Sequence, residues 1–346
     1  MTLVVTGATG FVGGAVARLL VERGHSVRAL VRPGSDASAL GQAGVEVVRG
    51  DLLDAPSLSA AVRGAEGLFH VAAVYSYSYR RPEELYRVNA DSVRSLFEAA
   101  RAAGVRRAVF TSTVATLKWP GPGHLADESC AARMDELPGH YKRSKLLGEQ
   151  AALSFNSPGF EVVVVNPTAP FGPGDARPTP TGRIVLEFLH RRFPGYVQTG
   201  VNVCDVDDAA HGHLAAFERG RPGERYILGG KENLSLAAIY RTLATATGLR
   251  RTPVRIPYAL AFAAGAVDFL IEGALLRRDP YIPIEGLRVA RHPMFVSCAK
   301  GIHELRLPQR AAIESLERAA RWYVDNGYAR VRAWSSPGSG RREPAK

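Results

Sequence analysis

The chain has 346 residues and a mass of 37.2 kDa, and 46% of its residues are apolar, as is typical of a soluble globular protein. The net charge is +11, but only six of the 44 basic residues are lysine and no nucleic-acid-binding motif accompanies them, so a nucleic-acid binder is disfavoured. The widely spaced Cys130, Cys204 and Cys298 indicate neither a disulfide framework nor a zinc site. A cytoplasmic location without a secretory signal is expected.

The first part of the chain alternates strand and helix patterns. Strands are predicted at residues 3–7, 25–32, 45–51, 67–73, 106–113 and 161–167. Helices are predicted at residues 11–23, 82–103 and 141–155, with a short helix between the third and fourth strands. Nearly all-apolar strands in this order indicate a parallel sheet that is covered on both faces. The predicted fold is therefore a doubly wound α/β (Rossmann) domain.

The pattern changes after Pro167. The stretch NPTAPFGPGDARPTPTG is rich in Pro and Gly and predicts a long functional loop at the carboxyl end of a strand. Helices follow at 182–193, 206–219, 235–247 and 310–326, with short strands near 196–203 and 224–228. The predicted division is a main domain at 1–167, to which 204–230 returns, a smaller and mainly helical substrate lobe at 168–203 and 231–330, and a disordered tail at 331–346.

Residues 256–276 form an apolar run about as long as a bilayer span, but Asp268 and Glu272 lie in its second half. Because charged side chains are costly in lipid, the sequence favours a buried or partly buried helix of the lobe. Peripheral contact with a membrane is the alternative, since a broadly apolar helix can also face lipid.

A glycine-rich loop, TGATGFVGG (6–14), joins the first predicted strand to the first helix. Gly7 allows a tight turn, Gly10 allows the backbone to approach a pyrophosphate, and Gly13 allows the helix to pack closely on the strand. The free N–H groups of the helix start then bind the negative charge. The loop predicts a dinucleotide site with contacts from Gly7, Thr9, Gly10, Phe11 and Val12.

The end of the second predicted strand indicates which dinucleotide is bound. Enzymes that select NAD usually carry Asp or Glu there, whereas this chain has Arg32, and Arg28 is a further cation on the strand. Arginine pairs well with a 2′-phosphate, so NADP(H) is favoured. NAD(H) stays open, because Asp36 could fold back towards a ribose. Asp51 and Leu52 are expected to flank the adenine.

Tyr141 and Lys145, in YKRSK, share one face of a predicted helix. Hydride transfer to a carbonyl requires a proton at the oxygen, and tyrosine, with a pKa of about 10, is a poor base at neutral pH. The ammonium of Lys145 is expected to favour the phenolate and to bond the nicotinamide ribose. A hydroxyl of Thr111, Ser112 or Thr113 is expected to hold the substrate oxygen.

Seven motifs follow one another over about the first 220 residues: TGATGFVG, GDLLD, FHVAA, VFTSTVAT, YKRSK, VNPTAPFGP and VCDVDDAAHGH. Together they resemble the extended short-chain dehydrogenase/reductases, the NAD-dependent epimerase/dehydratase family. The resemblance implies Tyr141 as the acid/base, Lys145 as its partner, and Thr113 as the catalytic hydroxyl in place of the more usual serine. It implies that four more residues line the cofactor: Ala72, Ala73, Pro167 and Thr168. Asn89 matches a family asparagine that supports the active-site backbone.

The runs at 166–189 and 196–230, with MFVSCAK at 294–300, resemble more closely the hopanoid-associated sugar epimerase subgroup, a relative of dihydroflavonol reductases. This resemblance implies a small-molecule substrate with a hydrophobic or sugar portion and a link to hopanoid lipid metabolism. Family members commonly form homodimers through helices on the flank of the sheet. Three arginines are candidates for contacting a diphosphate: Arg183, Arg191 and Arg192.

Several reactions share this scaffold. A dehydratase of this superfamily would carry Asp-Glu after the catalytic threonine, where this chain has Val114 and Ala115, so dehydration is disfavoured. Arg32 favours a reductase that exchanges NADP(H), whereas the subgroup's name favours an epimerase that retains NAD. A non-catalytic cofactor sensor is the remaining alternative, but such relatives typically lack the Tyr–Lys pair.

No metal site is predicted. Asp205, Asp207 and Asp208 are interpreted as the capped start of a helix, where negative charge is stabilised. His211 and His213 are two residues apart, so they do not share a helix face.

Overall fold

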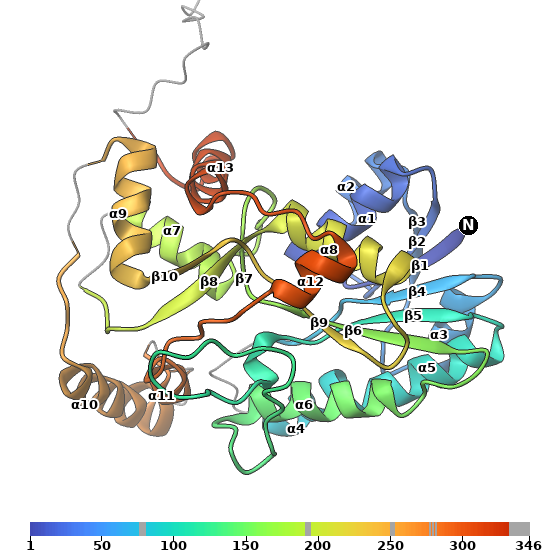
Figure 1. Ribbon diagram of the computed structural model, residues 1–346, viewed down its shortest axis with the longest axis horizontal. Coiled ribbons are helices and arrows are strands. Elements are labelled where there is room, and N and C mark those ends of the chain that lie inside the picture. Colours follow the sequence, from blue (N-terminus) through green and yellow to red (C-terminus); the bar gives the residue numbers. More distant parts are fainter. Residues whose placement is uncertain are drawn as a thin grey trace, which may run out of the picture.

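The computed structural model of the chain describes residues 1–75, 81–190, 195–249, 253–276, 278, 280 and 282–331, and all but the first residue of the expected disordered tail lies outside them. The main sheet has seven parallel strands in the order β3-β2-β1-β4-β5-β6-β9 (Figure 1). Its strands are β1 (Thr2–Thr6), β2 (Ser26–Val31), β3 (Glu46–Arg49), β4 (Gly67–His70), β5 (Arg107–Thr111), β6 (Glu161–Pro167) and β9 (Arg225–Leu228). The strand order reverses between β1 and β4, which is where such sheets bind ligands.

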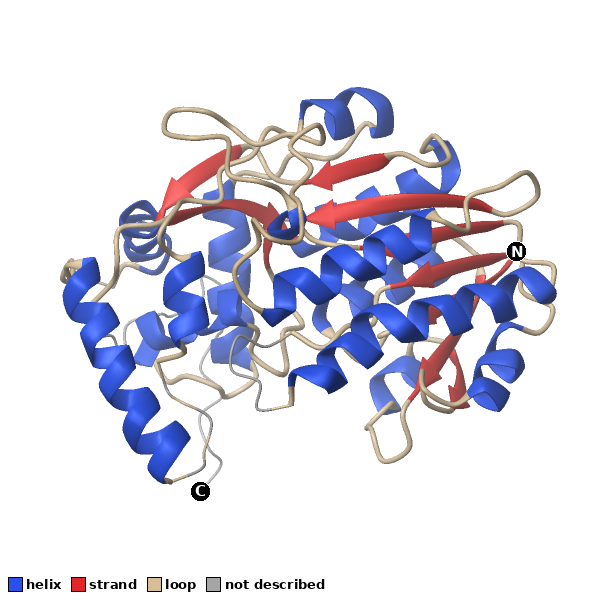
Figure 2. Ribbon diagram, turned by 90° about the horizontal axis from the view of Figure 1, so that it is seen from below, coloured by secondary structure: helices blue, strands red, loops and turns tan. Residues whose placement is uncertain are grey.

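Helices cover both faces of this sheet (Figure 2). One face packs against α1 (Phe11–Glu22), α2 (Ser38–Gln42), α8 (Val206–Arg219) and α12 (Ala299–Leu305). The other packs against α3 (Ala55–Val62), α5 (Ser92–Ala102) and α6 (His140–Leu153). In β1, Leu3 and Val5 enter the first cluster and Val4 the second, and all three are fully buried. Burial on both faces explains why the strands are continuously apolar, and the predicted doubly wound fold is confirmed.

The helix predicted at 82–103 has a wide turn within it. It comprises α4 (Pro82–Tyr86), a π-helical segment η1 (Arg87–Asp91) and α5. Such π-turns inside α-helices often lie at functional sites. This one contains Asn89, whose side chain is buried.

The second lobe has a small sheet as well as helices. Strands β7 (Ala169–Phe171), β8 (Gly200–Asp205) and β10 (Glu232–Ser235) pair in the order β10-β8-β7, with β10 antiparallel and β7 parallel to β8. Helices α7 (Pro180–His190), α9 (Leu236–Thr247) and α13 (Ala312–Asp325) pack with it. The strand expected near 224–228 is β9 and joins the main sheet beside β6.

The apolar run forms helix α10 (Tyr258–Asp268), continued by the π-helical segment η3 (Phe269–Leu275), at one end of the molecule (Figure 1). By length and composition alone, Tyr258–Leu275 could cross a membrane, yet only 6% of it is buried. The helix is therefore not fully buried, and of the two expected forms the structure has the partly buried one. One side of the run packs against α11 (Ile284–Val289), and the opposite side is exposed.

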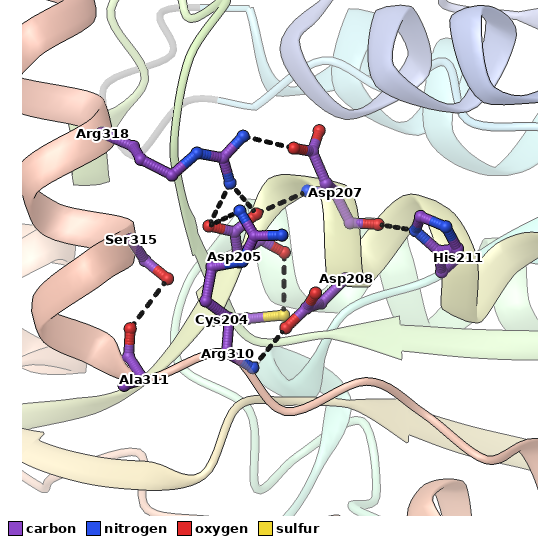
Figure 3. A network of polar contacts seen from close by, with 9 residues as sticks. All are labelled: Cys204, Asp205, Asp207, Asp208, His211, Arg310, Ala311, Ser315 and Arg318. Carbon is purple, nitrogen blue, oxygen red and sulfur yellow. Dashed lines mark hydrogen bonds and ion pairs between the residues drawn. The ribbon is translucent and has the colours of Figure 1, made fainter.

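Acidic residues at the start of α8 join this helix to α13 (Figure 3). Asp205 caps α8 by accepting from the Asp207 N–H at 2.9 Å, and both its oxygens accept from Arg318 at 2.7 and 2.8 Å. Asp207 also pairs with Arg318, and Asp208 accepts from the Arg310 N–H at 2.7 Å. The predicted capped helix start is confirmed.

Candidate active site

A cavity of about 840 Å³ opens at the carboxyl ends of the main strands, between the sheet and the second lobe. Every residue predicted to bind the cofactor or to act in catalysis lines it: Gly7, Thr9, Gly10, Phe11, Val12, Arg32, Asp51, Leu52, Ala72, Ala73, Thr113, Tyr141, Lys145, Pro167 and Thr168. The fold thus brings together groups that are up to 161 positions apart in the chain.

The glycine loop is shaped by close backbone contacts. Gly7 has φ +75°, and a Cβ there would lie 2.7 Å from the Ala72 backbone. A Cβ on Gly13 would lie 2.2 Å from the Gly7 carbonyl oxygen. Helix α1 starts after Gly10 with no acidic residue in its first turn, so its leading N–H groups can receive a pyrophosphate. The loop has the form that a bound dinucleotide requires.

The side chain of Thr6 links β1 and β4, the two strands between which the strand order reverses. Its hydroxyl lies 2.7 Å from His70 Nδ1 and accepts from the Ala72 N–H at 3.2 Å. Burial lowers the pKa of His70 to about 3, so its imidazole is neutral. These contacts fix the segment after β4 that forms one cavity wall.

The end of β2 presents one cation to the cavity. Arg32 lines it, whereas Arg28 pairs with Glu46 at 3.0 Å and donates to carbonyls at the end of α3. Asp36 accepts from the Ser38 N–H at 2.9 Å outside the cavity lining, and this bond lowers the pKa of its carboxyl. Asp36 is therefore not folded back towards a ribose.

Tyr141 stands in the first turn of α6, with its side chain buried against the ring of Tyr75 at 4.6 Å. A hydrogen bond links its phenol to Thr113. Burial raises the pKa of Tyr141 above its ordinary value, and the Thr113 bond opposes this only in part. The phenol is therefore protonated at neutral pH, and the expected stabilisation of the phenolate by Lys145 stays a prediction.

Lys145 lies one turn further along α6 and is almost fully buried. Its ammonium donates to the Thr111 carbonyl at 2.7 Å and lies 4.8 Å from the centre of the Phe110 ring. Burial lowers the pKa of Lys145 to about 8, with Glu149 acting in the opposite direction. The lysine is thus anchored to the end of β5.

The three candidate hydroxyls at the end of β5 have different partners. Thr111 Oγ1 lies 2.9 Å from His213 Nε2, and Ser112 donates to Glu149. Thr113 is the one that bonds Tyr141, while its own carbonyl accepts from Asn166 at 3.1 Å. The geometry therefore selects Thr113 among the three.

Sequence reasoning missed Glu149, which holds the segment after β5 in place through hydrogen bonds. It is fully buried and accepts from Ser112, Thr116 and Asn166, and it pairs with Arg225 of β9 at 2.9 Å. Its position one turn beyond Lys145 was the signal available in the sequence.

The side chain of Asn89 lies between the segment after β4 and helix α6. Its amide accepts from the Val74 N–H at 2.8 Å and donates to the Val74 carbonyl and to the Ser144 hydroxyl, both at 3.0 Å. The side chain thereby ties the segment after β4 to α6. This arrangement fits a support for the active-site backbone.

The lobe contributes wall residues that the sequence did not single out, among them Asp175, Arg177 and His292. Asp175 is buried and accepts from the Tyr323 hydroxyl at 2.8 Å, which ties the proline-rich loop to α13. Of the arginines proposed for a diphosphate, Arg183 is exposed and outside the cavity lining, and the other two (191 and 192) lie outside the described residues.

Comparisons with known proteins agree with this arrangement. Residues 3–229 match the model of the NAD dependent epimerase/dehydratase family. A putative dihydroflavonol 4-reductase from Synechocystis is 42% identical over 94% of this chain and 96% of its own. Sterol demethylase protein B from Methylococcus capsulatus is 32% identical over 94% and 99%.

A solved structure has the same architecture. The nucleoside-diphosphate-sugar epimerase of Pseudomonas aeruginosa superposes with a TM-score of 0.78 at 27% identity, covering 95% of this chain and 99% of its own. Reductases and epimerases are thus both among the relatives, and the enzyme class is that of an NAD(P)-dependent oxidoreductase or epimerase. The chain belongs to the NAD dependent epimerase/dehydratase family, the extended short-chain dehydrogenase/reductases.

Proposed function

We propose that the chain is an NADP(H)-dependent reductase that converts a carbonyl of a hydrophobic small molecule into an alcohol. The observation that carries the proposal is the buried phenol of Tyr141, which lines the same cavity as Thr113, Lys145 and the glycine loop. A protonated phenol is a proton donor, which reduction requires at the carbonyl oxygen.

Each residue of the site has its own role in the proposed reaction. The bound nicotinamide supplies the hydride. Thr113 and Tyr141 hold the carbonyl oxygen, and Tyr141 gives it the proton that completes the alcohol. Lys145 holds the ribose, and its charge stabilises the phenolate that remains until solvent returns the proton. Glu149 and Asn89 hold these groups in position through hydrogen bonds, and neither side chain lines the cavity.

Arg32 supports NADP(H) over NAD(H). Its guanidinium is the cation at the end of β2 that lines the cavity, and the nearby carboxylate of Asp36 is directed elsewhere. Arg177 of the lobe also lines the cavity and adds a further cation. Paired guanidinium–phosphate hydrogen bonds are strong, so a 2′-phosphate would gain affinity here.

The lobe side of the cavity supports a hydrophobic substrate. Ile184, Val201, Leu236, Val289 and Met294 form much of this wall. The relative named sterol demethylase protein B refers to a polycyclic lipid, which supports a polycyclic lipid, such as a hopanoid intermediate, as the substrate class.

An epimerase that retains NAD is the second candidate. The likeness to a nucleoside-diphosphate-sugar epimerase favours it, because epimerases use the same fold to oxidise and re-reduce one sugar carbon. We also propose a cytoplasmic setting, supported by three unpaired cysteines, and homodimerisation stays an untested prediction.

The test combines cofactor binding with turnover. The cofactor-stripped protein is titrated with NADPH and NADH by Trp fluorescence, since Trp119 stacks at 3.9 Å on His292 of the cavity wall. NADPH should bind more tightly, and Arg32→Glu should weaken NADPH by about tenfold or more while leaving NADH nearly unchanged. Tyr141→Phe should retain NADPH binding and lose roughly 10²-fold or more in NADPH oxidation with hydrophobic ketones.

Arg23→Glu is the matched control, because Arg23 is exposed at the far end of α1. It should leave both affinities unchanged. A preference for NADH, or NAD that cannot be stripped, would contradict the reductase and make the epimerase the leading function.

A further inference from the structure

We propose that the protein docks on an anionic lipid surface through the outer face of α10 and η3, and that its hydrophobic substrate enters from that side. The entry route rests on the proposed function, whereas the docking does not. The outer face is defined by its exposed residues: Leu260, Ala263, Ala264, Val267, Leu270, Ile271, Ala274 and Leu275.

The outer face is a continuous apolar stripe. Its members recur every three or four residues, so they lie along one side of the helix. Leu260 is 63%, Leu270 62% and Leu275 76% exposed, and no charged residue interrupts the series. An exposed apolar surface of this length on a folded protein marks an interaction site.

The acidic residues of the run lie on the opposite side. The Asp268 carboxylate accepts from the Ile282 N–H at 2.7 Å, in the segment that leads into α11. Glu272 is half-buried. The carboxylate of Asp268 is therefore directed towards the protein, and neither acidic residue belongs to the outer face, so this face can enter the interface without burying them.

Exposed arginines flank the docking helix along the chain and lie in and after its neighbour α11. Arg255 precedes α10, Arg278 follows η3, and Arg288 and Arg291 lie in and just after α11, and all four are exposed. Basic residues around an apolar helical face are attracted to anionic lipid headgroups. A second copy of this chain, which carries a net charge of +11, would instead bring like charges together, so the surface chemistry favours a lipid over a homodimer.

The helix lies on the lipid and does not cross it. Its inner side is attached to α11, where Gly265 permits close approach: a Cβ there would lie 2.8 Å from the Leu287 side chain. The Tyr258 hydroxyl donates to the Leu287 carbonyl at 3.1 Å. A spanning helix would have to give up these contacts, whereas an interfacial helix keeps them.

Helix α11 connects the outer face to the active site. Gly286 and Val289 line the cavity, and Glu285 accepts from the Tyr141 N–H at 3.4 Å at the start of α6. One short helix thus contacts the docking helix on one side and the catalytic helix on the other. A lipid-soluble substrate could pass along it into the cavity without crossing bulk water.

The experiment measures vesicle binding by co-sedimentation of the full chain. Vesicles of phosphatidylcholine alone are compared with an equal mixture of phosphatidylcholine and phosphatidylglycerol. The chain should bind the anionic vesicles more tightly, and added salt should weaken this binding. Leu270→Gln combined with Leu275→Gln should weaken it at least roughly tenfold, because two buried apolar side chains are lost. Arg288→Gln with Arg291→Gln should reduce the preference for anionic lipid.

Ile302→Gln and Ile313→Gln, which change exposed isoleucines of α12 and α13, are the matched controls and should bind as the wild type does. Circular dichroism and NADPH affinity establish that each variant is folded. Failure of the wild type to bind either vesicle would overturn the proposal. So would a dimer in solution that dissociates on changing Leu270 and Leu275, since a second copy would then cover the outer face. Vesicle binding without NADPH binding would contradict the entry route and the reductase, and leave the docking standing.

Discussion

At the scale of single residues, burial controls the chemistry of the site more than charge does. Tyr141 has Lys145 one turn away, yet burial raises the pKa of the phenol and the ammonium is bonded to the Thr111 carbonyl. The same burial lowers the pKa of Lys145 to about 8. Burial thus moves the two pKa values in opposite directions, raising that of the Tyr141 phenol and lowering that of the Lys145 ammonium.

This burial predicts a pH dependence of cofactor affinity. Because the pKa of Lys145 is about 8, the ammonium is present below that pH and lost above it. NADPH affinity should therefore fall as pH rises through 8. Lys145→Arg keeps its charge at every pH in this range, so its affinity should be flat, as fluorescence titration can determine.

Lys142 provides the control for this measurement. Burial also lowers its pKa to about 8, but it does not line the cavity. Lys142→Met should keep the fall in affinity above pH 8. If the fall disappears in this variant and persists in Lys145→Arg, the assignment to Lys145 is wrong.

At the scale of elements, sequence analysis predicted those features of the fold and the site that depend on a local sequence pattern. The apolar strands, the glycine loop and the Tyr–Lys spacing each depend on neighbours within a few positions. Four further residues of the cavity lining came from the family resemblance and not from local pattern: Ala72, Ala73, Pro167 and Thr168. Glu149 and Asp175 were missed because their roles depend on partners far along the chain, Arg225 and Tyr323. Whether α10 has an exposed side was left open, with membrane contact as the alternative, because an apolar run looks the same whether it faces a core or a surface.

The contact between the glycine loop and α1 gives a prediction about stability. Gly13→Ala would put a Cβ 2.2 Å from the Gly7 carbonyl oxygen, so α1 must shift. The free energy of unfolding should fall by about 1–3 kcal/mol in urea denaturation, with weaker NADPH binding.

Gly41→Ala is the matched helical control. Nothing lies within 4 Å of a Cβ at Gly41 in α2, so the substitution should be neutral or stabilising by up to about 1 kcal/mol. Equal destabilisation by both substitutions would show that helix propensity, and not the close contact, sets the effect.

At the scale of the whole molecule, the start of α8 joins the sheet to the C-terminal helix. Asp205 is fully buried, and Arg318 of α13 bonds both of its oxygens (Figure 3). Asp205→Ala removes the helix cap and the partner of Arg318, and should lower the free energy of unfolding by roughly 2–4 kcal/mol. Asp205→Asn should cost less, because asparagine retains the cap.

Urea denaturation followed by circular dichroism compares these variants with Glu317→Ala. Glu317 pairs with Arg321 on the surface of the same α13 helix, so its removal should change the free energy of unfolding by about 0.5 kcal/mol or less. A loss at Glu317 as large as that at Asp205 would contradict the assigned importance of the buried pair.

The path of the chain also constrains how the enzyme can open. After β6 the chain enters the lobe, returns through α8 and β9 to complete the main sheet, leaves again at β10, and comes back at α12 against α8 and β9. Two bodies joined by a single linker can swing freely about one hinge, but here several segments cross between the main sheet and the lobe, so a hinge motion would have to bend all of them together. We therefore expect a smaller opening than a single linker would allow, with product leaving through movement of the cavity walls.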